Sequence, residues 1–190
     1  LLRARSFQQD DSHNFISEDM ISDEYEHIFS ICKKFYGIFN LEYSFRLGTR
    51  PSQFMGDKNV WDKAEKNLTE ILEKSGKKYH IAEGDGAFYG PKIDIIMKDS
   101  LGREWQMGTI QLDFQLPLRF GLEYTDKDGK RKTPVVVHRV IYGSLERFIG
   151  ILIEHTIGKF PLWLSPVQTR IIPIGESHHE KALEIQGLIK

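Results

Sequence analysis

A run of polar side chains near the start of the sequence has the residue types and the spacing that bind small polar ligands. Gln9, Asp11 and His13 occupy alternate positions, so they share one face if the segment is extended. An amide, a carboxylate and an imidazole on one face can hold a small polar molecule or a metal ion. The alternative is a surface loop between Phe7 and Phe15, which the composition alone favours.

A second candidate segment combines backbone freedom with polar and aromatic side chains. Three glycines within residues 84–90 permit close approach of the backbone to a ligand. They would bring Tyr89 and Lys92 to the rim of a substrate site. The alternative is a hairpin connection with packed aromatic rings.

The predicted strand that follows carries a third set of polar residues. Regular alternation places Thr109 and Gln111 on one face of this strand and Gln106 on the other. A buried Gln111 would need a hydrogen-bonding partner, which the polar lining of a cleft supplies. A solvated sheet face is the equally simple alternative.

The fourth polar segment runs from a predicted strand through a glycine turn into a predicted helix. Arg147 lies in the first turn of that helix, where the macrodipole disfavours a cation, so it is a candidate for binding a phosphate or a base. The alternative is a surface arginine paired with a carboxylate. His138 follows three valines, which favours a histidine satisfied within the core. His13 and His138 lie too far apart in the chain for their spacing to indicate a metal site. The sequence also indicates no catalytic triad.

Secondary-structure patterns place these segments on a sheet flanked by helices. Ser17, Asp57 and Ser144 are expected to cap helices, and Gly37 and Gly76 to end them. Strands are expected at residues 3–9, 41–47, 79–83, 91–98, 103–115, 134–141 and 167–174, and helices at 18–36, 58–75, 144–157 and from 178. The last helix of the sheet region should bury Leu145, Phe148, Ile149 and Leu152. This order, without βαβ alternation, predicts an α+β fold with a mostly antiparallel sheet and excludes a Rossmann or P-loop fold.

Composition and charge exclude several classes of protein. The 190 residues contain 26 Lys plus Arg and 27 Asp plus Glu, a net charge of −1, which excludes a strongly basic protein that coats a polyanion. The single cysteine, Cys32, excludes an internal disulfide and is expected to be a buried residue, neither ligand nor nucleophile. No apolar run approaches the roughly 18 residues of a membrane span. Pro161 and Pro166 flank a linker, which predicts domains at residues 1–164 and 165–190.

Four motifs together resemble one protein family. The chain contains, in this order, RxRxFxQDDxH, EGxGAFYGPKID, QxGTxQLDF and VxHRxIxGSxERFxGxLIEH. They resemble the catalytic domain of the threonyl-tRNA synthetases, a class II aminoacyl-tRNA synthetase family, over essentially the whole chain. Residues 1–15 resemble the second half of motif 2 of this class, and residues 134–156 resemble motif 3. The resemblance implies an antiparallel sheet flanked by helices, followed from about residue 165 by the start of an α/β anticodon-binding domain.

The resemblance also implies an activity, its cofactors and its site. It implies a ligase that uses ATP, Mg²⁺ and Zn²⁺ to convert threonine to threonyl-adenylate and then transfers threonine to tRNA(Thr). It also implies a cytoplasmic homodimer without membrane contact. Phe7 and Arg147 would sandwich the adenine. The implied site residues are Arg147 and Arg3 for catalysis; Phe7, Gln106, Thr109 and Arg147 for ATP; Gln9, Asp11, Tyr89 and Gln111 for threonine; and His13 and His138 as two of three zinc ligands.

The chain also departs from the family pattern. The third zinc ligand of the family is a cysteine that precedes motif 2, and Cys32 does not match its position. Motif 1 and the motif 2 arginine that grips the α-phosphate are absent as well. We therefore expect a fragment cut at both ends that is inactive alone.

Two other functions compete with this interpretation. One is a non-enzymatic relative that binds a partner or senses a nucleotide. The other is a different class II synthetase, such as a prolyl or seryl enzyme. The combination of His13, His138 and Asp11 favours the threonine enzyme over both.

Overall fold

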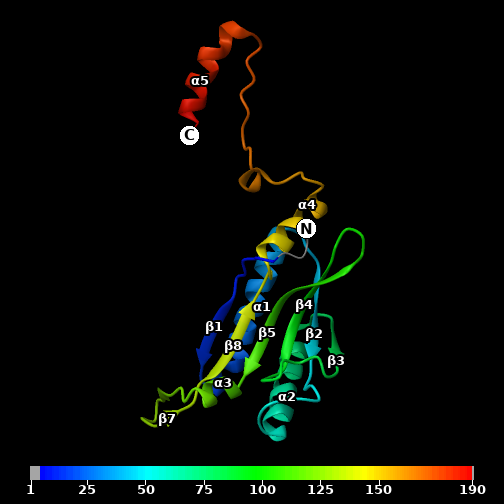
Figure 1. Ribbon diagram of the computed structural model, residues 1–190, viewed down its shortest axis with the longest axis vertical. Coiled ribbons are helices and arrows are strands. Elements are labelled where there is room, and N and C mark those ends of the chain that lie inside the picture. The colour runs from blue at the N-terminus through cyan, green and yellow to red at the C-terminus, as the bar shows by residue number, and fades with distance from the viewer. Residues whose placement is uncertain (1–4, 190) are drawn as a thin grey trace. The chain divides into compact units, whose positions relative to one another are not determined.

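The computed structural model describes residues 5–189, which form two compact units. The first unit reaches His155 and contains the sheet, and the second begins at Thr156 and contains α5 (His179–Leu188) (Figure 1). Among the helices of the described range, none is both long enough and apolar enough to cross a membrane.

A six-stranded sheet forms the centre of the first unit. In spatial order its strands are β1 (Ser12–Ile16), β8 (Val135–Val140), β5 (Glu104–Asp113), β4 (Lys92–Lys98), β2 (Tyr43–Gly48) and β3 (Tyr79–Ala82), as Figure 1 shows. All neighbours are antiparallel except β2 and β3, which are parallel because α2 (Lys58–Ser75) crosses between them. The predicted α+β fold with a mostly antiparallel sheet is confirmed.

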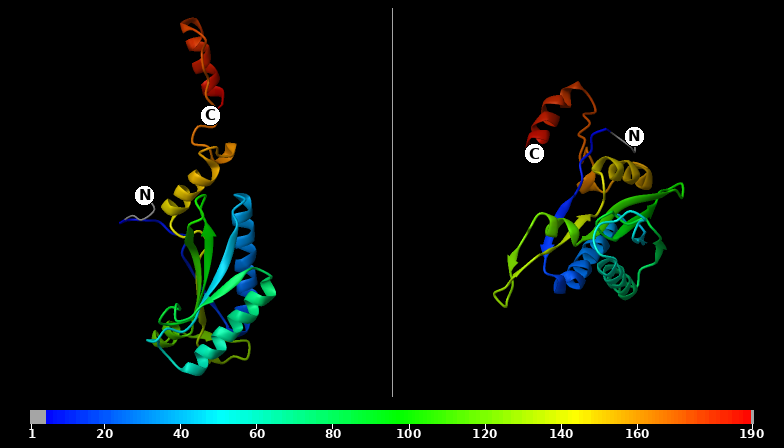
Figure 2. Two further views of the ribbon diagram at one scale, coloured as in Figure 1. Left: turned by 90° about the vertical axis from the view of Figure 1, so that its right-hand side faces the viewer. Right: turned by 60° about the horizontal axis from the view of Figure 1, so that its bottom comes forward.

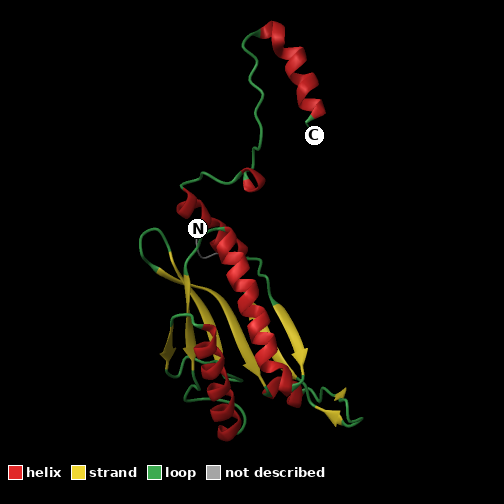
Figure 3. Ribbon diagram, turned by 180° about the vertical axis from the view of Figure 1, so that it is seen from behind, coloured by secondary structure: helices red, strands yellow, loops and turns green. Residues whose placement is uncertain are grey.

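Two helices, α1 (Ile21–Ile38) and α2, cover one face of this sheet, as the side view and the view from behind show (Figures 2 and 3). Phe29 of α1 stacks on Phe45 of β2 with 4.6 Å between ring centroids. The strand side chains beneath the helices are almost completely buried: Phe45, Leu47, Ile93, Ile95, Ile110, Leu112 and Val137. An antiparallel sheet covered in this way leaves its opposite face to polar side chains.

The remaining elements of the first unit extend the ends of the sheet. α3 (Gln115–Arg119) follows β5, and β6 (Tyr124–Thr125) pairs with β7 (Arg131–Lys132) across the predicted turn at residues 126–129. α4 (Leu145–Thr156) follows β8 and packs on α1, where the ring centroids of Phe148 and Phe35 lie 5.1 Å apart. A short 3-10 turn at Glu18–Met20 precedes α1, and two more, at Leu162–Leu164 and Glu176–His178, belong to the second unit.

The bounds of α2 are those predicted from local signals. The Oδ1 of Asp57 accepts the backbone N–H of Asn59 at 2.6 Å, which satisfies one of the free amides of the first turn. Gly76 ends the helix in the left-handed conformation, with φ at 64°. The buried stripe of α2 consists of Trp61, Ala64, Leu68, Ile71 and Leu72.

Replacing Asp57 by alanine removes this acceptor, and we expect the free energy of unfolding to fall by about 1 kcal/mol. Urea denaturation of the wild type and the variant measures the difference. Asp57→Asn keeps an acceptor oxygen and is expected to retain most of the stability. Equal losses in the two variants would contradict the capping role.

Two predicted strands are not formed. Of the strand predicted at residues 3–9, residues 3 and 4 lie outside the described residues, and residues 5–8 are irregular. The first strand begins at Ser12, because Gln8 and Gln9 pair with the start of α4 instead of with a neighbouring strand. Residues 167–174 form no strand, since no strand within the described chain lies beside them to complete a ladder.

Three details of helix ends and faces also differ from prediction. α1 continues past Gly37 to Ile38, and Asn40 takes the positive φ of 53° instead. The hydroxyl of Ser17 donates to the carboxylate of Asp19 and caps no backbone amide. In α4, Phe148 and Leu152 are buried as predicted, but Leu145 is only half-buried and Ile149 is 45% exposed. Ile151 is buried instead, because it follows Phe148 by three positions and so shares its face of the helix.

Candidate active site

The sheet face opposite α1 and α2 is polar and carries the candidate site. Phe45 of β2 faces α1, so its neighbour Arg46 faces the other way. Pairing across the sheet extends this face through the other strands and adds Lys92, Asp94, Thr109, Gln111, Asp113, His138 and His13. Residues that are far apart in the sequence are thereby brought together on one surface.

A hollow of about 420 Å³ lies at one end of this face. Phe7, which is 55% exposed, and Arg147 of α4 line it together with Gln106 and Thr109 of β5. The four residues that the sequence assigns to ATP thus surround one hollow. Gln9, assigned to threonine, lines it as well. Arg3, assigned to the phosphate side, lies outside the described residues.

Gln106 and Thr109 share this hollow because the strand pairing is irregular. The prediction that they lie on opposite faces is wrong. Ile95 of β4 pairs with Gly108, but Ile96 pairs with Gln106, so Met107 is an extra residue in β5. A bulge of this kind interrupts the alternation of side chains and returns Gln106 to the face of Thr109.

Three contacts that sequence reasoning missed hold Gln106 in place. Its Nε2 donates to Asp94 at 2.9 Å, and its Oε1 accepts from Arg46 at 3.0 Å. Its backbone carbonyl accepts from Arg147 at 3.1 Å. Asp94 is completely buried and also lies 3.2 Å from the Nζ of Lys92. The signal in the sequence is a lone aspartate within an apolar strand, because a buried carboxylate needs partners.

A tight turn at Gly143 presents Arg147 to the hollow. Gly143 has a φ of 78°, and a Cβ there would lie 2.1 Å from the carbonyl oxygen of Met107, so the turn requires glycine. The Oγ of Ser144 accepts the backbone N–H of Arg147 at 3.1 Å, which confirms the predicted cap. The guanidinium carbon of Arg147 lies 5.4 Å from the ring of Trp105. Arg147 thus lies in the first turn of α4, as predicted.

Tyr89 and Gln111 form a second polar group farther along the face. The Tyr89 hydroxyl donates to the Oε1 of Gln111, which supplies the partner that a partly buried glutamine needs. Burial raises the pKa of Tyr89, and the carboxylates of Asp113 and Asp11 raise it further. The hydroxyl is therefore a hydrogen-bond donor at neutral pH, and Asp11 lies close enough to influence it.

His13 and His138 face each other across the β1–β8 pair. The two residues are direct partners in the strand register, and their ring centroids lie 4.7 Å apart. The Nε2 of His138 lies 3.0 Å from the Oδ2 of buried Asp113, so this carboxylate orients the ring. The His138 side chain is mostly buried, at 17% exposed, and has a hydrogen-bonding partner, as the interpretation of a satisfied histidine requires, but it lies on the polar face of the sheet.

The histidine pair fits part of a zinc site. Zinc takes about three or four protein donors, commonly imidazole and thiolate. Within residues 5–189, no group of three or more His, Cys, Asp or Glu side chains is arranged to hold a metal. Cys32 does not complete the pair, since it is buried on α1 at the opposite face and burial raises the pKa of its thiol to about 12. A zinc ion bound to this pair would therefore need a further donor from outside residues 5–189.

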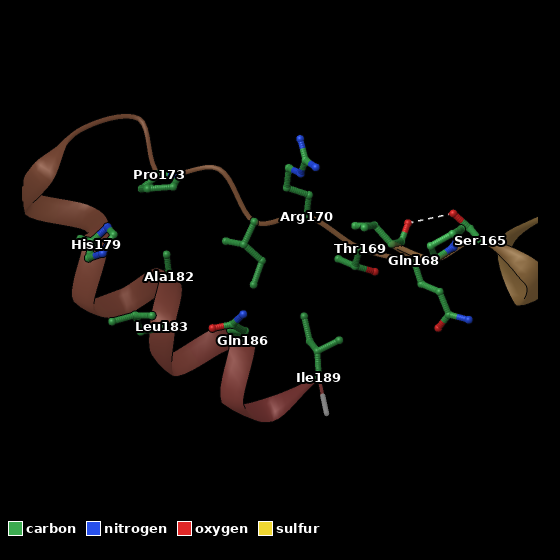
Figure 4. A pocket seen from close by; sticks show the side chains of 13 residues that line it. Ser165, Gln168, Thr169, Arg170, Pro173, His179, Ala182, Leu183, Gln186 and Ile189 are labelled. Carbon is green, nitrogen blue, oxygen red and sulfur yellow. Dashed lines mark hydrogen bonds between the residues drawn. The ribbon is translucent and has the colours of Figure 1, made fainter. Parts of the chain in front are cut away.

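A separate hollow of about 730 Å³ lies within the second unit (Figure 4). Residues 165–171 and α5 line it with mixed side chains that include Arg170, His179 and Gln186. No side chain of α5 is buried, and none of the predicted site residues lines this hollow. The candidate active site is therefore the polar face of the sheet.

Comparison with known proteins identifies a family. Residues 1–156 match the family described as tRNA synthetase class II core domain (G, H, P, S and T). The chain is 52% identical over 185 residues to a threonine–tRNA ligase of Carboxydothermus hydrogenoformans, covering 97% of this chain and 29% of that protein. It is 50% identical over 194 residues to the threonine–tRNA ligase of Natranaerobius thermophilus, covering 99% of this chain and 30% of that one.

Solved structures agree with these sequence matches. A crystal structure described as the RNA binding domain of threonyl-tRNA synthetase from Cryptosporidium parvum superposes with a TM-score of 0.93 at 43% identity, covering 98% of this chain and 47% of that chain. A putative threonyl-tRNA synthetase from Aeropyrum pernix gives 0.78 at 33% identity, covering 98% and 44%. The resemblance found in the motifs is confirmed. The chain spans about three tenths of the length of the curated relatives.

Proposed function

This chain belongs to the class II tRNA synthetase core-domain family, and we propose that it forms the adenylation core of a threonine–tRNA ligase. One observation carries the proposal: the hollow beside Arg147 and the histidine pair lie on the same polar sheet face, joined by β5 and β8. An adenylating enzyme needs a nucleotide site and an amino-acid site side by side, so that the two substrates react at their meeting point.

The hollow is the proposed ATP site. The exposed ring of Phe7 and the guanidinium of Arg147 would sandwich the adenine by stacking and cation–π contact. Gln106 and Thr109 would lie near the ribose, and Arg3 near the phosphates. Mg²⁺, when bound with ATP, would neutralise phosphate charge.

The region around Tyr89 and the histidine pair is the proposed threonine site. Gln9, Asp11, Tyr89 and Gln111 would bind the amino acid, and His13 and His138 would be two ligands of a zinc ion. A zinc ion held by these histidines would supply a Lewis acid for the amino and hydroxyl groups of threonine. Valine has nearly the same shape but lacks the hydroxyl, so it would leave Asp11 unpartnered and be rejected strongly. Serine keeps the hydroxyl and lacks only a methyl group, so its rejection would be weak.

The proposed chemistry is displacement at phosphorus. A threonine carboxylate oxygen forms a bond to the α-phosphorus of ATP, and pyrophosphate leaves with the electrons of the broken phosphorus–oxygen bond. Arg147, with Arg3, would stabilise the negative charge that develops on the phosphates, which is the main contribution that fixed cations make to such reactions. In the second step a terminal hydroxyl oxygen of tRNA(Thr) would form a bond to the acyl carbon of the adenylate. AMP would leave with the electrons of the broken carbon–oxygen bond, and the hydroxyl proton would be released.

The full-length ligase that we propose is a cytoplasmic homodimer. The residues from about 165 onward would be the start of its anticodon-binding domain, with residues 1–164 belonging to the catalytic domain. In this arrangement much of the tRNA contact lies outside the sheet described here. A near-neutral net charge of −1 is compatible with that arrangement.

ATP–pyrophosphate exchange with each amino acid in turn tests the proposed function on the full-length protein. We expect exchange that depends on threonine. The isolated 190 residues are expected to give none, because the family's α-phosphate arginine and third zinc ligand are not among them. Exchange with a different amino acid would overturn the threonine assignment, and no exchange at all would favour a non-enzymatic relative. Threonine-dependent exchange by residues 1–190 alone would contradict their inactivity.

A further inference from the structure

A set of contacts fastens the segment before β1 to the start of α4. The backbone N–H of Gln8 donates to both carboxylate oxygens of Glu146 at 3.2 Å. The carbonyl of Gln8 accepts the N–H of Leu145 at 2.8 Å, and Gln9 pairs with Ser144 as an isolated antiparallel bridge. Two segments at opposite ends of the first unit's sequence are thus held in a fixed register.

Asp10 adds a second carboxylate to this contact set. Its Oδ2 accepts the N–H of Ile141 at 2.8 Å, and its Oδ1 accepts the N–H of Tyr142 at 3.2 Å. Those two amides lie between the end of β8 and the turn at Gly143, so strand pairing does not satisfy them. Burial raises the pKa of Asp10 while the two amide donors oppose the rise, so the hydrogen bonds favour the charged carboxylate.

The fastened segments end at the two proposed adenine-binding residues. Phe7 directly precedes Gln8, and Arg147 directly follows Glu146. Both Phe7 and Arg147 line the hollow, whereas neither Asp10 nor Glu146 does. Any effect of the two carboxylates on the nucleotide must therefore be indirect.

We propose that Asp10 and Glu146 are positioning residues for ATP: they fix the separation of Phe7 and Arg147 and so the width of the adenine site. This inference rests on the proposed function. Stacking on both faces of adenine requires a fixed separation between the Phe7 ring and the Arg147 guanidinium. A guanidinium that no longer lies over the face of the adenine ring loses much of its cation–π attraction. Loosening either carboxylate contact is expected to weaken adenine binding more than threonine binding.

Exchange kinetics of four variants of the full-length protein test the inference. Glu146→Ala and Asp10→Ala remove the acceptors, and we expect each to raise the KM for ATP by about tenfold, the loss that accompanies one charge-assisted hydrogen bond. The KM for threonine should stay within about twofold of the wild type in Glu146→Ala. In Asp10→Ala it should rise less than the KM for ATP, because Asp10 lies between the proposed threonine residues Gln9 and Asp11. Glu146→Gln keeps an acceptor oxygen for the single N–H of Gln8 and is expected to restore most of the ATP affinity. Asp10→Asn keeps only one of its two acceptor oxygens and is expected to restore part of it.

Glu154→Gln is the matched control, because Glu154 lies on the same helix and pairs with Arg103 away from the hollow. Each variant is assayed well below its own Tm, so that lost stability is separated from lost affinity. An unchanged KM for ATP, equal rises in both KM values, or no recovery in Glu146→Gln and Asp10→Asn would overturn the inference. A wild-type protein without threonine-dependent exchange would instead overturn the proposed function, and the inference with it.

Discussion

Arg147→Ala is expected to lower kcat/KM for ATP in pyrophosphate exchange by about 10²–10³-fold, the usual effect of removing one group that stabilises transition-state charge. The side chain lines the hollow from the first turn of α4 and donates to the carbonyl of Gln106. Its removal takes away both a wall of the adenine site and a fixed positive charge. The KM for threonine should change less than the KM for ATP, because of the proposed threonine residues only Gln9 lines this hollow, and Asp11, Tyr89 and Gln111 do not.

Two further variants sharpen this expectation. Arg147→Lys keeps the charge but not the planar guanidinium, so we expect it to recover only a small part of the activity. Arg131→Ala removes an exposed arginine of β7 that pairs with Glu123, and it should behave as the wild type. Full activity in Arg147→Lys would show that charge alone matters and would contradict the adenine sandwich. Equal losses in Arg147→Ala and Arg131→Ala would contradict a role for Arg147 at the site.

His138→Ala is expected to reduce the zinc content of the full-length protein from about one ion per chain to almost none. We also expect kcat/KM for threonine to fall by about 10³-fold or more. Without zinc, the site would lose the group that recognises the threonine hydroxyl, which valine lacks. Metal analysis of the purified protein and exchange assays measure the two effects. His13→Ala should give the same result, since the two rings face each other at 4.7 Å.

Asp113 and His80 provide the comparison for the histidine variants. Asp113→Asn removes the carboxylate that orients His138, and we expect zinc affinity to weaken by about 10–100-fold. His80→Ala removes an exposed histidine of β3 and should leave zinc content unchanged. Full zinc occupancy with unaltered threonine selectivity in His138→Ala would refute the ligand assignment.

Local signals in the sequence predict those elements whose bounds depend only on neighbouring residues. The helix at residues 58–75 has its cap at Asp57 and its end at Gly76, as predicted. Strands were also predicted at the positions of β4, β5 and β8, whereas β1, which carries His13, was not predicted. These features depend on residues within a few positions of one another, which is the distance over which periodicity and capping act.

Features that depend on distant partners were not predictable in this way. The bulge at Met107 depends on how β5 pairs with β4, and it moves Gln106 to the face of Thr109. Residues 3–9 have the pattern of a strand, but Gln8 is bound by Glu146, which lies much later in the chain. The facing of His13 and His138 depends on the register of β1 and β8, which sequence spacing does not encode. The prediction that these two histidines belong to one site comes from the family resemblance and not from periodicity.

The most direct test of one continuous site for ATP and threonine is the binding of a non-hydrolysable threonyl-adenylate analogue to the full-length protein, measured by calorimetry. We expect it to bind at least about 10²-fold more tightly than threonine or ATP alone, because it spans both halves of the site. Arg147→Ala and Asp11→Asn should each weaken this binding from opposite ends, and the valyl analogue should bind poorly. Equal affinity for the threonyl and valyl analogues, or unchanged affinity in either variant, would contradict a single site on this sheet face.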